Sequence, residues 1–107
     1  MGEAVQRRRY PRFKSAGILV AWQASAISSV SRMETLGLGG MFLLTRQPPP
    51  IRSTVKLLLD LPVGEVRARA VVRRVSPLHG MGVEFISMSQ EDRARLNRSL
   101  LALPATS

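Results

Sequence analysis

The clearest pattern along the chain is a pair of segments in which apolar and polar residues alternate. In residues 55–61 every second position is apolar, and Lys56 and Asp60 lie between them. In residues 66–73 valine and alanine alternate with arginine. Alternation with a period of two is typical of strands with one buried face. A turn over residues 62–65 joins the segments, which predicts an antiparallel hairpin with an arginine-rich outer face.

Four further short apolar segments extend this pattern into a larger sheet. They cover residues 17–22, 27–34, 41–44 and 81–85. Breaks separate them: Thr35–Gly40 holds three glycines, and Pro48 begins a run of three prolines. The chain therefore predicts an all-β fold with one helix, namely a six-stranded antiparallel Greek-key barrel, split in form and capped by a C-terminal α-helix.

The predicted helix begins after Ser89, which suits an N-cap, with Asp92 three residues later as in a capping box. Leu96, Leu100 and Leu103 are spaced to share one buried face, and Pro104 ends the pattern. We expect the arginines of this helix to be available to solvent. They are Arg93, Arg95 and Arg98.

The composition narrows the function classes. The 107 residues suit one domain, and 16 Lys+Arg against 7 Asp+Glu give a net charge of +9. This charge suits nucleotides, nucleic acids or anionic membrane surfaces, and alone it does not choose among them. There is no cysteine, no apolar signal-peptide core at the start and no apolar run near the roughly 18 residues of a membrane span. We expect a cytoplasmic protein without a membrane span.

Catalytic chemistry has little support in the sequence. His79 is the single histidine, and no recognisable motif places a nucleophile or a carboxylate beside it. No residues have metal-ligand spacing, and the glycine-rich turn lacks the Gly-Lys-Ser/Thr ending of a P-loop. We therefore expect neither an enzyme nor a bound cofactor or metal.

The N-terminal residues 1–14 are predicted to be a flexible basic arm, and residues 15–103 the barrel with its helix. Arg7, Arg8 and Arg9 precede Tyr10-Pro11-Arg12. Because Pro11 disfavours a helical Tyr10, the arm should be extended or turned and able to wrap a ligand. A solvated tail or a general polyanion-binding arm is the alternative.

Three landmarks in order carry a family resemblance. Arg8-x-x-x-Arg12 is followed by Leu38-Gly-Gly-Met-Phe-Leu43 and then by Gly80-Met-Gly-Val-Glu-Phe85, which leads into the Ser89 helix. Over residues 7–102 this pattern resembles the PilZ family. The resemblance implies a six-stranded barrel that binds the bacterial second messenger cyclic di-GMP.

The resemblance also implies site residues. The family uses Arg-x-x-x-Arg, matched here by Arg8 and Arg12, and Asp/Asn-x-Ser-x-x-Gly, for which Gly40 matches while Thr35 and Gly37 depart. A missing charge-assisted hydrogen bond at Thr35 costs about 1.5–3 kcal/mol, and a missing serine hydroxyl at Gly37 costs about 1 kcal/mol. The implied ligand-binding residues are Arg7, Arg8, Arg12, Thr35, Gly37, Gly39 and Gly40. Secondary candidates are Arg9, Arg32, His79 and Gly82.

We therefore expect a cyclic di-GMP receptor whose arm and surface change on binding to regulate a protein partner, in motility or biofilm formation. The alternative is a PilZ-like interaction module that no longer binds nucleotide and acts in motility or pilus assembly. Non-specific nucleic-acid binding is a third, weaker interpretation, because the chain has few aromatic residues to stack on bases. Specific nucleic-acid recognition is not expected.

Overall fold

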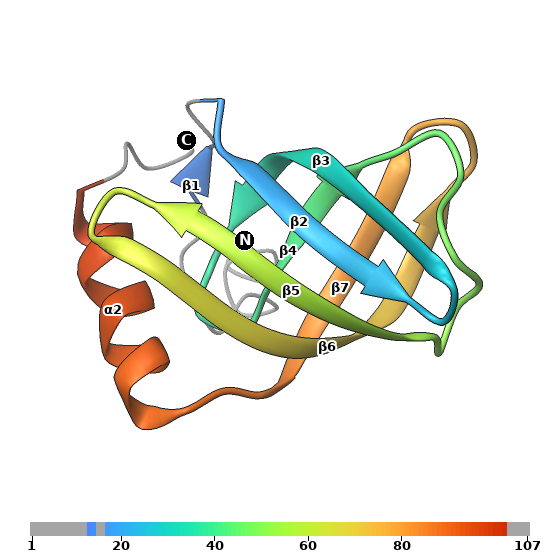
Figure 1. Ribbon diagram of the computed structural model, residues 1–107. Helices are drawn as coiled ribbons and strands as arrows, with labels where there is room; N and C mark the ends of the chain where they lie inside the picture. The colour runs from blue at the N-terminus through green and yellow to red at the C-terminus, as the bar shows by residue number, and fades with distance from the viewer. Residues whose placement is uncertain (1–12, 15–16, 103–107) are drawn as a thin grey trace, which may run out of the picture.

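The computed structural model describes residues 13–14 and 17–102. Six of its strands form the walls of a barrel, with a helix at one end (Figure 1). The six are β2 (Leu19–Ala24), β3 (Ile27–Leu36), β4 (Gly40–Leu44), β5 (Thr54–Leu61), β6 (Gly64–Ser76) and β7 (Gly80–Ser87). They are joined by the short β1 (Phe13–Lys14) and followed by α2 (Gln90–Leu101).

All the strand pairs are antiparallel, and their order closes a ring. The neighbours run β3-β2-β5-β6-β7-β4, and β4 pairs in turn with β3. Each of the six strands thus has two neighbours in the ring, and β3 pairs with β2 through residues 27–32 and with β4 through residues 33–36. The predicted six-stranded antiparallel barrel with a C-terminal helix is confirmed. β1 adds to β3 outside this ring, through pairs that join Phe13 to Leu36 and Lys14 to Thr35.

The barrel interior is filled by the inward residues of every strand in the ring. Trp22 is 3% exposed, and its indole Nε1 donates a hydrogen bond of 2.8 Å to the hydroxyl of Ser31. This pair satisfies the one polar group that the tryptophan brings into the core. Trp22 is thus a core residue, as its place beside Ile18 and Val20 in the apolar run indicates.

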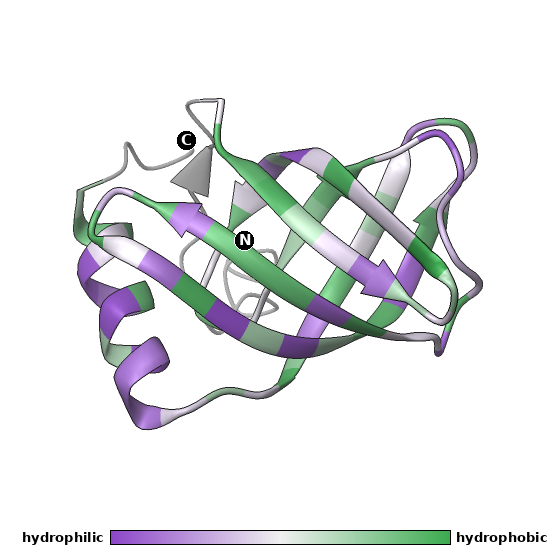
Figure 2. Cartoon of the chain, viewed as in Figure 1, coloured by the Kyte–Doolittle hydropathy of each residue, from purple (hydrophilic) through white to green (hydrophobic). Residues whose placement is uncertain are grey.

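The hairpin of β5 and β6 follows the predicted alternation. Val55, Leu57, Leu59 and Leu61 are buried, as are the valines and alanines opposite them, while Arg67 and Arg69 are exposed. The alternation appears as bands of opposite hydropathy along β6 (Figure 2). The strand runs on to Ser76, beyond the predicted end at residue 73. A register shift between Val72 and Arg74 interrupts the period of two, so the continuation carries no alternating pattern.

The predicted turn over Thr35–Gly40 is longer than the observed one. Thr35 and Leu36 belong to β3, where they pair with Phe42 and Met41 of β4, and β4 itself begins at Gly40. Only the residues 37–39 connect the two strands. The glycine content suggested a longer turn, whereas the pairing of Leu36 on both sides, with β1 and β4, extends the strand.

The helix α2 begins as predicted. The Ser89 hydroxyl accepts a hydrogen bond of 3.0 Å from the Asp92 backbone N–H and donates one of 2.8 Å to the Asp92 carboxylate. Leu96 and Leu100 are buried, while Leu103 lies outside the described residues. Arg93 and Arg98 are exposed as predicted, whereas Arg95 is only partly exposed, and its guanidinium donates to the carbonyl of Glu65 at the start of β6 at 2.9 Å. This hydrogen bond docks the helix beside the barrel (Figure 1).

Within the described part of the chain, no helix has the length and apolar character needed to span a bilayer.

Candidate functional site

The sequence-predicted site residues fall into two groups. Arg7, Arg8, Arg9 and Arg12 lie outside the described residues. The remaining seven predicted residues are described, and all of them except Arg32 lie where β3, β4 and β7 meet. They are Arg32, Thr35, Gly37, Gly39, Gly40, His79 and Gly82. The geometry of this second group defines the candidate site.

The turn between β3 and β4 is held by two backbone hydrogen bonds. The Gly37 N–H donates to the carbonyl of Gly40 at 2.9 Å, and the Phe85 N–H of β7 donates to the carbonyl of Gly39 at 2.9 Å. The turn is therefore fixed both to itself and to the neighbouring strand. The backbone of residues 37–40, which includes the buried Gly37, is therefore held in one conformation by these hydrogen bonds, and we call it the ledge.

Gly40 is required by lack of space. A Cβ atom placed there would overlap the carbonyl oxygen of Val83 and come within 3.2 Å of the Glu84 Cα. Its φ lies outside the left-handed region that favours glycine, so the restriction is steric rather than conformational. The matched glycine of the sequence motif thus has a packing role in bringing β4 against β7.

Thr35 lies between two strands. In the sheet register it pairs with Lys14 of β1 on one side and with Phe42 of β4 on the other. Because β1 starts at Phe13, the residue that directly follows Arg12, the strand that carries the second motif is paired with the strand that continues the first. The second motif therefore lies beside the strand that begins directly after the first motif in the sequence.

An aromatic cluster that the sequence did not indicate lies next to Thr35. Phe42 is only 7% exposed yet stands apart from the connected core, because strand alternation puts Met41 and Leu43 inside the barrel and Phe42 outside. The His79 ring lies 5.4 Å from the Phe42 ring at an interplanar angle of 36°. The guanidinium carbon of Arg74 lies 5.9 Å from the centre of the same ring. We call Phe42, Arg74 and His79 the Phe42 cluster.

The two glycines of β7 make room for this cluster. A Cβ at Gly80 would lie 2.6 Å from Cε1 of Phe42, so a side chain is excluded there. Gly82 pairs with Phe42 across the sheet, and a Cβ at Gly82 would find ordinary contacts of 3.6–3.7 Å to Arg74 and Phe42. The tolerance at Gly82 contrasts with the strict need for glycine at positions 40 and 80.

The described charges around this site nearly cancel. Arg73 pairs with Glu84 at 2.6 Å, and Glu84 lies opposite Gly40 in the register. His79 Nε2 lies 3.9 Å from the Glu34 carboxylate. The Arg73–Glu84 ion pair is about half exposed, so it contributes little to stability. Arg73 and Arg74 thus stand against Glu34 and Glu84, so these four side chains together carry no net charge.

Arg32 occupies a different position from the rest. It is exposed on β3, where it pairs with Leu19 of β2, whereas the pairs of β3 with β4 begin at Met33. Between residues 17 and 102, no group of three or more His, Asp or Glu side chains is arranged to hold a metal ion. Sequence reasoning missed Phe42 and Arg74. The signal available for Phe42 was its place between two inward residues of β4, which predicts an outward ring.

Comparisons with known proteins agree on one family. The model of the PilZ domain family matches residues 6–102. Among solved structures, the PilZ domain of YcgR from Escherichia coli with c-di-GMP superimposes with a TM-score of 0.74 at 20% identity, covering 92% of each chain. The inhibitor of motility MotI/DgrA from Bacillus subtilis gives a TM-score of 0.75 at 22% identity, covering 91% of this chain and 51% of that one.

A third structure is the c-di-GMP complex of MrkH from K. pneumonia, with a TM-score of 0.73 at 21% identity. It is covered over 51% of its length, and this chain over 91%. The chain therefore spans about half the length of the B. subtilis and K. pneumonia proteins that it resembles. No curated protein matches the sequence. At these identities the structural matches establish the fold.

Proposed function

Because this chain belongs to the PilZ domain family, we propose that it is a receptor for cyclic di-GMP. The family is tied to cyclic di-GMP signalling in bacteria, and its domains are typically non-catalytic receptors. The observation that carries the proposal is the pairing of β1 with β3, which sets the strand following Arg12 beside Thr35. Arg12 and Arg8 then supply the first half of the site, and the Gly37–Gly40 ledge supplies the second.

Covalent geometry supports this assignment. Consecutive Cα atoms are 3.8 Å apart, and an extended chain spans at most about 3.6 Å per residue. Arg12 is bonded to the residue that pairs with Leu36, and Arg8 lies five residues before that residue, so its Cα lies within about 18 Å of it. Both arginines are within reach of a ligand that lies on the ledge.

The charges of the described surface also support a site in which the arm supplies the arginines and the ledge supplies the backbone surface. Cyclic di-GMP carries two phosphodiester anions, and the charges of Arg73, Arg74, Glu34 and Glu84 nearly cancel. The positive charge must therefore come from the arm, whose arginines can fork onto phosphate oxygens or onto the O6/N7 edge of guanine. We propose that the exposed ring of His79, which lies against Phe42, offers the surface against which a guanine packs.

Calorimetric titration of the folded chain with cyclic di-GMP tests the proposal, with GMP as the matched control nucleotide. We expect saturable binding of the cyclic dinucleotide and at least about tenfold weaker binding of GMP, which carries one phosphate and one base. A folded protein that gives no saturable heat up to high micromolar cyclic di-GMP would overturn it.

A second function rests on the departures at Thr35 and Gly37. Threonine brings one hydroxyl and no charge where the family pattern has an acid or amide, and glycine brings no side chain where it has serine. These departures favour a domain that docks a protein without nucleotide, in motility or pilus assembly. The double variant Thr35→Asp with Gly37→Ser separates the two functions: a gain of tenfold or more in affinity indicates a weakened nucleotide site, and no gain favours the docking module.

A further inference from the structure

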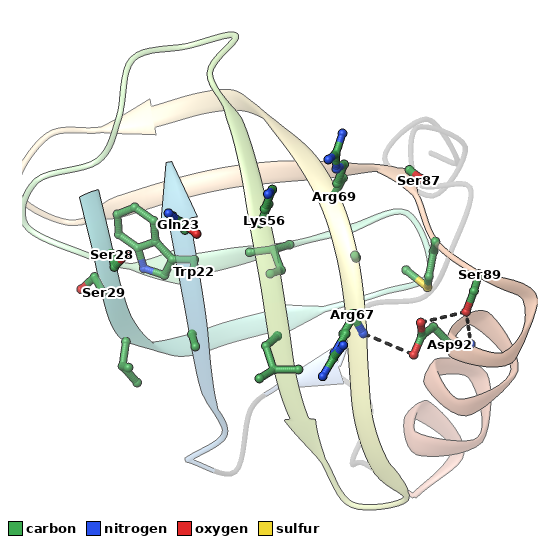
Figure 3. A pocket seen from close by; sticks show the side chains of 16 residues that line it. Trp22, Gln23, Ser28, Ser29, Lys56, Arg67, Arg69, Ser87, Ser89 and Asp92 are labelled. Carbon is green, nitrogen blue, oxygen red and sulfur yellow. Dashed lines mark hydrogen bonds between the residues drawn. The ribbon is translucent and has the colours of Figure 1, made fainter. Parts of the chain in front are cut away.

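An open groove lies on the outer face of the barrel, apart from the ledge and the Phe42 cluster. It has a volume of about 820 Å³ and crosses β3, β2, β5 and β6 as far as the segment between β7 and α2 (Figure 3). None of the sequence-predicted ligand residues that the structure describes lines it. The groove therefore needs an explanation of its own.

The floor of the groove is apolar along one row of the sheet. The register places Val30, Ala21 and Leu58 side by side on successive strands, and the row ends at Arg67. Val30 is 62% exposed, which is unusual for a valine within a strand. Because neighbouring strands lie about 4.8 Å apart, the row from Val30 to Arg67 is about 14 Å wide.

One side of this floor is cationic. The next row holds Gln23, Lys56 and Arg69, so Lys56, Arg67 and Arg69 stand together along β5 and β6 (Figure 3). Among the described residues, the ion pairs are Arg73–Glu84, His79–Glu34 and Arg95–Asp92, and none involves these three cations. Their charges are free to meet a partner.

The acidic side chains nearby do not neutralise the cationic side. Asp92 lines the groove, but its carboxylate already accepts hydrogen bonds from the Ser89 hydroxyl, the Arg67 backbone N–H and Arg95. Asp60 and Glu65 pair with each other two positions along the strands from Leu58 and Arg67, on the opposite side of the floor. The outer face of β5 and β6 thus carries Lys56 and Arg69 on one side of the apolar row, and Asp60 and Glu65 on the other side, beyond the lining of the groove.

We propose that this groove docks an acidic amphipathic helix of a partner protein. The three strands β2, β5 and β6 that cross its floor are paired on both sides, so a partner lying over the floor cannot add a strand to them and must bind through side chains. A helix is about 10–12 Å across and fits a row of about 14 Å. Its apolar face would cover Val30 and Leu58, and its acidic residues would face Lys56, Arg67 and Arg69. A second copy of this chain, itself carrying +9, is a poor occupant.

This inference goes beyond the proposed nucleotide site and does not depend on it, because its test is run without nucleotide. The probe is a displayed library of random peptides of about 16 residues, long enough for four helical turns, selected on the immobilised full chain at about 0.15 M salt. We expect enriched peptides to carry a surplus of Asp and Glu, with apolar residues at helical spacing. Enrichment of peptides without an acidic surplus would overturn the proposal.

The best peptide is then synthesised, and its affinity for variants is measured by fluorescence anisotropy. Arg67→Glu with Arg69→Glu should weaken binding at least about tenfold, and Lys56→Gln about threefold. The matched double variant Arg93→Glu with Arg98→Glu, which makes the same charge change on the exposed side of α2, should stay within about twofold. Thermal melting confirms that each variant is folded. If the groove double variant does not fold, Lys56→Gln tests the groove in its place.

Three results would contradict the proposal. One is an equal fall in affinity in the groove and helix double variants. Another is that the selection enriches no peptide, and that the chain instead binds anionic phospholipid vesicles or a DNA duplex of about 20 base pairs through the groove arginines. That result would assign the groove to those polyanions. The third is a dimer in sedimentation velocity that the groove double variant abolishes, which would assign the groove to a second copy of this chain.

Discussion

Thr35 of β3 pairs directly with Lys14 of β1, so the strand that carries the second sequence motif adjoins the strand that continues the arginine arm. We propose that this pairing joins the two motifs into one site. Within the described residues, the ledge and the Phe42 cluster are held by backbone hydrogen bonds and glycine packing, with hardly any net charge. In the proposed site, the arm brings the positive charge to this surface.

The close packing at Gly40 gives a first prediction. Gly40→Ala places a Cβ atom onto the carbonyl oxygen of Val83, so β4 and β7 must separate. We expect the free energy of unfolding to fall by about 3 kcal/mol, at the upper end of the range for overpacking. Gly82→Ala is the control, because its Cβ meets only ordinary contacts, and it should change stability by less than about 1 kcal/mol. Urea denaturation measures both, and equal decreases would refute the steric argument.

The buried hydrogen bond between Trp22 and Ser31 gives a second prediction. Ser31→Ala leaves the indole N–H without its partner inside the barrel, which should cost about 1–3 kcal/mol of unfolding free energy. Ser29→Ala, on the same strand and exposed, should cost less than about 0.5 kcal/mol. The fluorescence of the single tryptophan reports the transition. A cost no larger than that of the control would mean that the indole finds another partner.

The N-cap of α2 gives a third prediction. Ser89→Ala removes both the acceptor for the Asp92 backbone N–H and the donor to its carboxylate. We expect the free energy of unfolding to fall by about 1 kcal/mol. Ser89→Asp restores a capping acceptor but sets a second carboxylate beside Asp92, so it should recover only part of that stability. Chemical denaturation followed by circular dichroism checks the order: wild type, then Ser89→Asp, then Ser89→Ala.

The carboxylate of Glu84, next to the ledge, gives a fourth prediction. Glu84 lies opposite Gly40, and its negative charge opposes a bound phosphate. Glu84→Gln also frees Arg73 from its ion pair, so the affinity for cyclic di-GMP should rise about threefold at low salt. Raising the salt should shrink this gain, because exposed charges are screened. Glu91→Gln makes the same charge change on exposed α2 and should leave the affinity unchanged, and equal gains in both variants would show that only net charge matters.

Much of the fold is predictable from local patterns. The period of two in residues 55–61 and 66–72 gives β5 and the first part of β6, and Ser89 with Asp92 marks the start of α2. The end of β6 is not predictable in this way, since the register shift between Val72 and Arg74 breaks the alternation. The same holds for Arg95, whose hydrogen bond to Glu65 depends on where the helix docks.

The candidate site was only partly predictable, because some of its contacts join segments that are distant in sequence. Motif spacing points to Thr35, Gly37 and Gly40, because these residues are close in sequence. The Phe42 cluster unites three separate segments, and its members carry no shared motif. Phenylalanine is a residue type that is usually buried in the core, and only the position of Phe42 between two inward residues of β4 indicates that it faces outward.

Calorimetric titration of arm variants tests most directly whether the arm and the ledge together bind cyclic di-GMP. We predict saturable binding to the wild-type chain, weakened at least about tenfold by Arg8→Ala or by Arg12→Ala, since each removes a charge-assisted hydrogen bond. Arg93→Ala, an exposed helix residue, is the matched control and should bind like the wild type. Arm variants that bind as tightly as Arg93→Ala, in a folded protein, would contradict a site shared by the arm and the ledge.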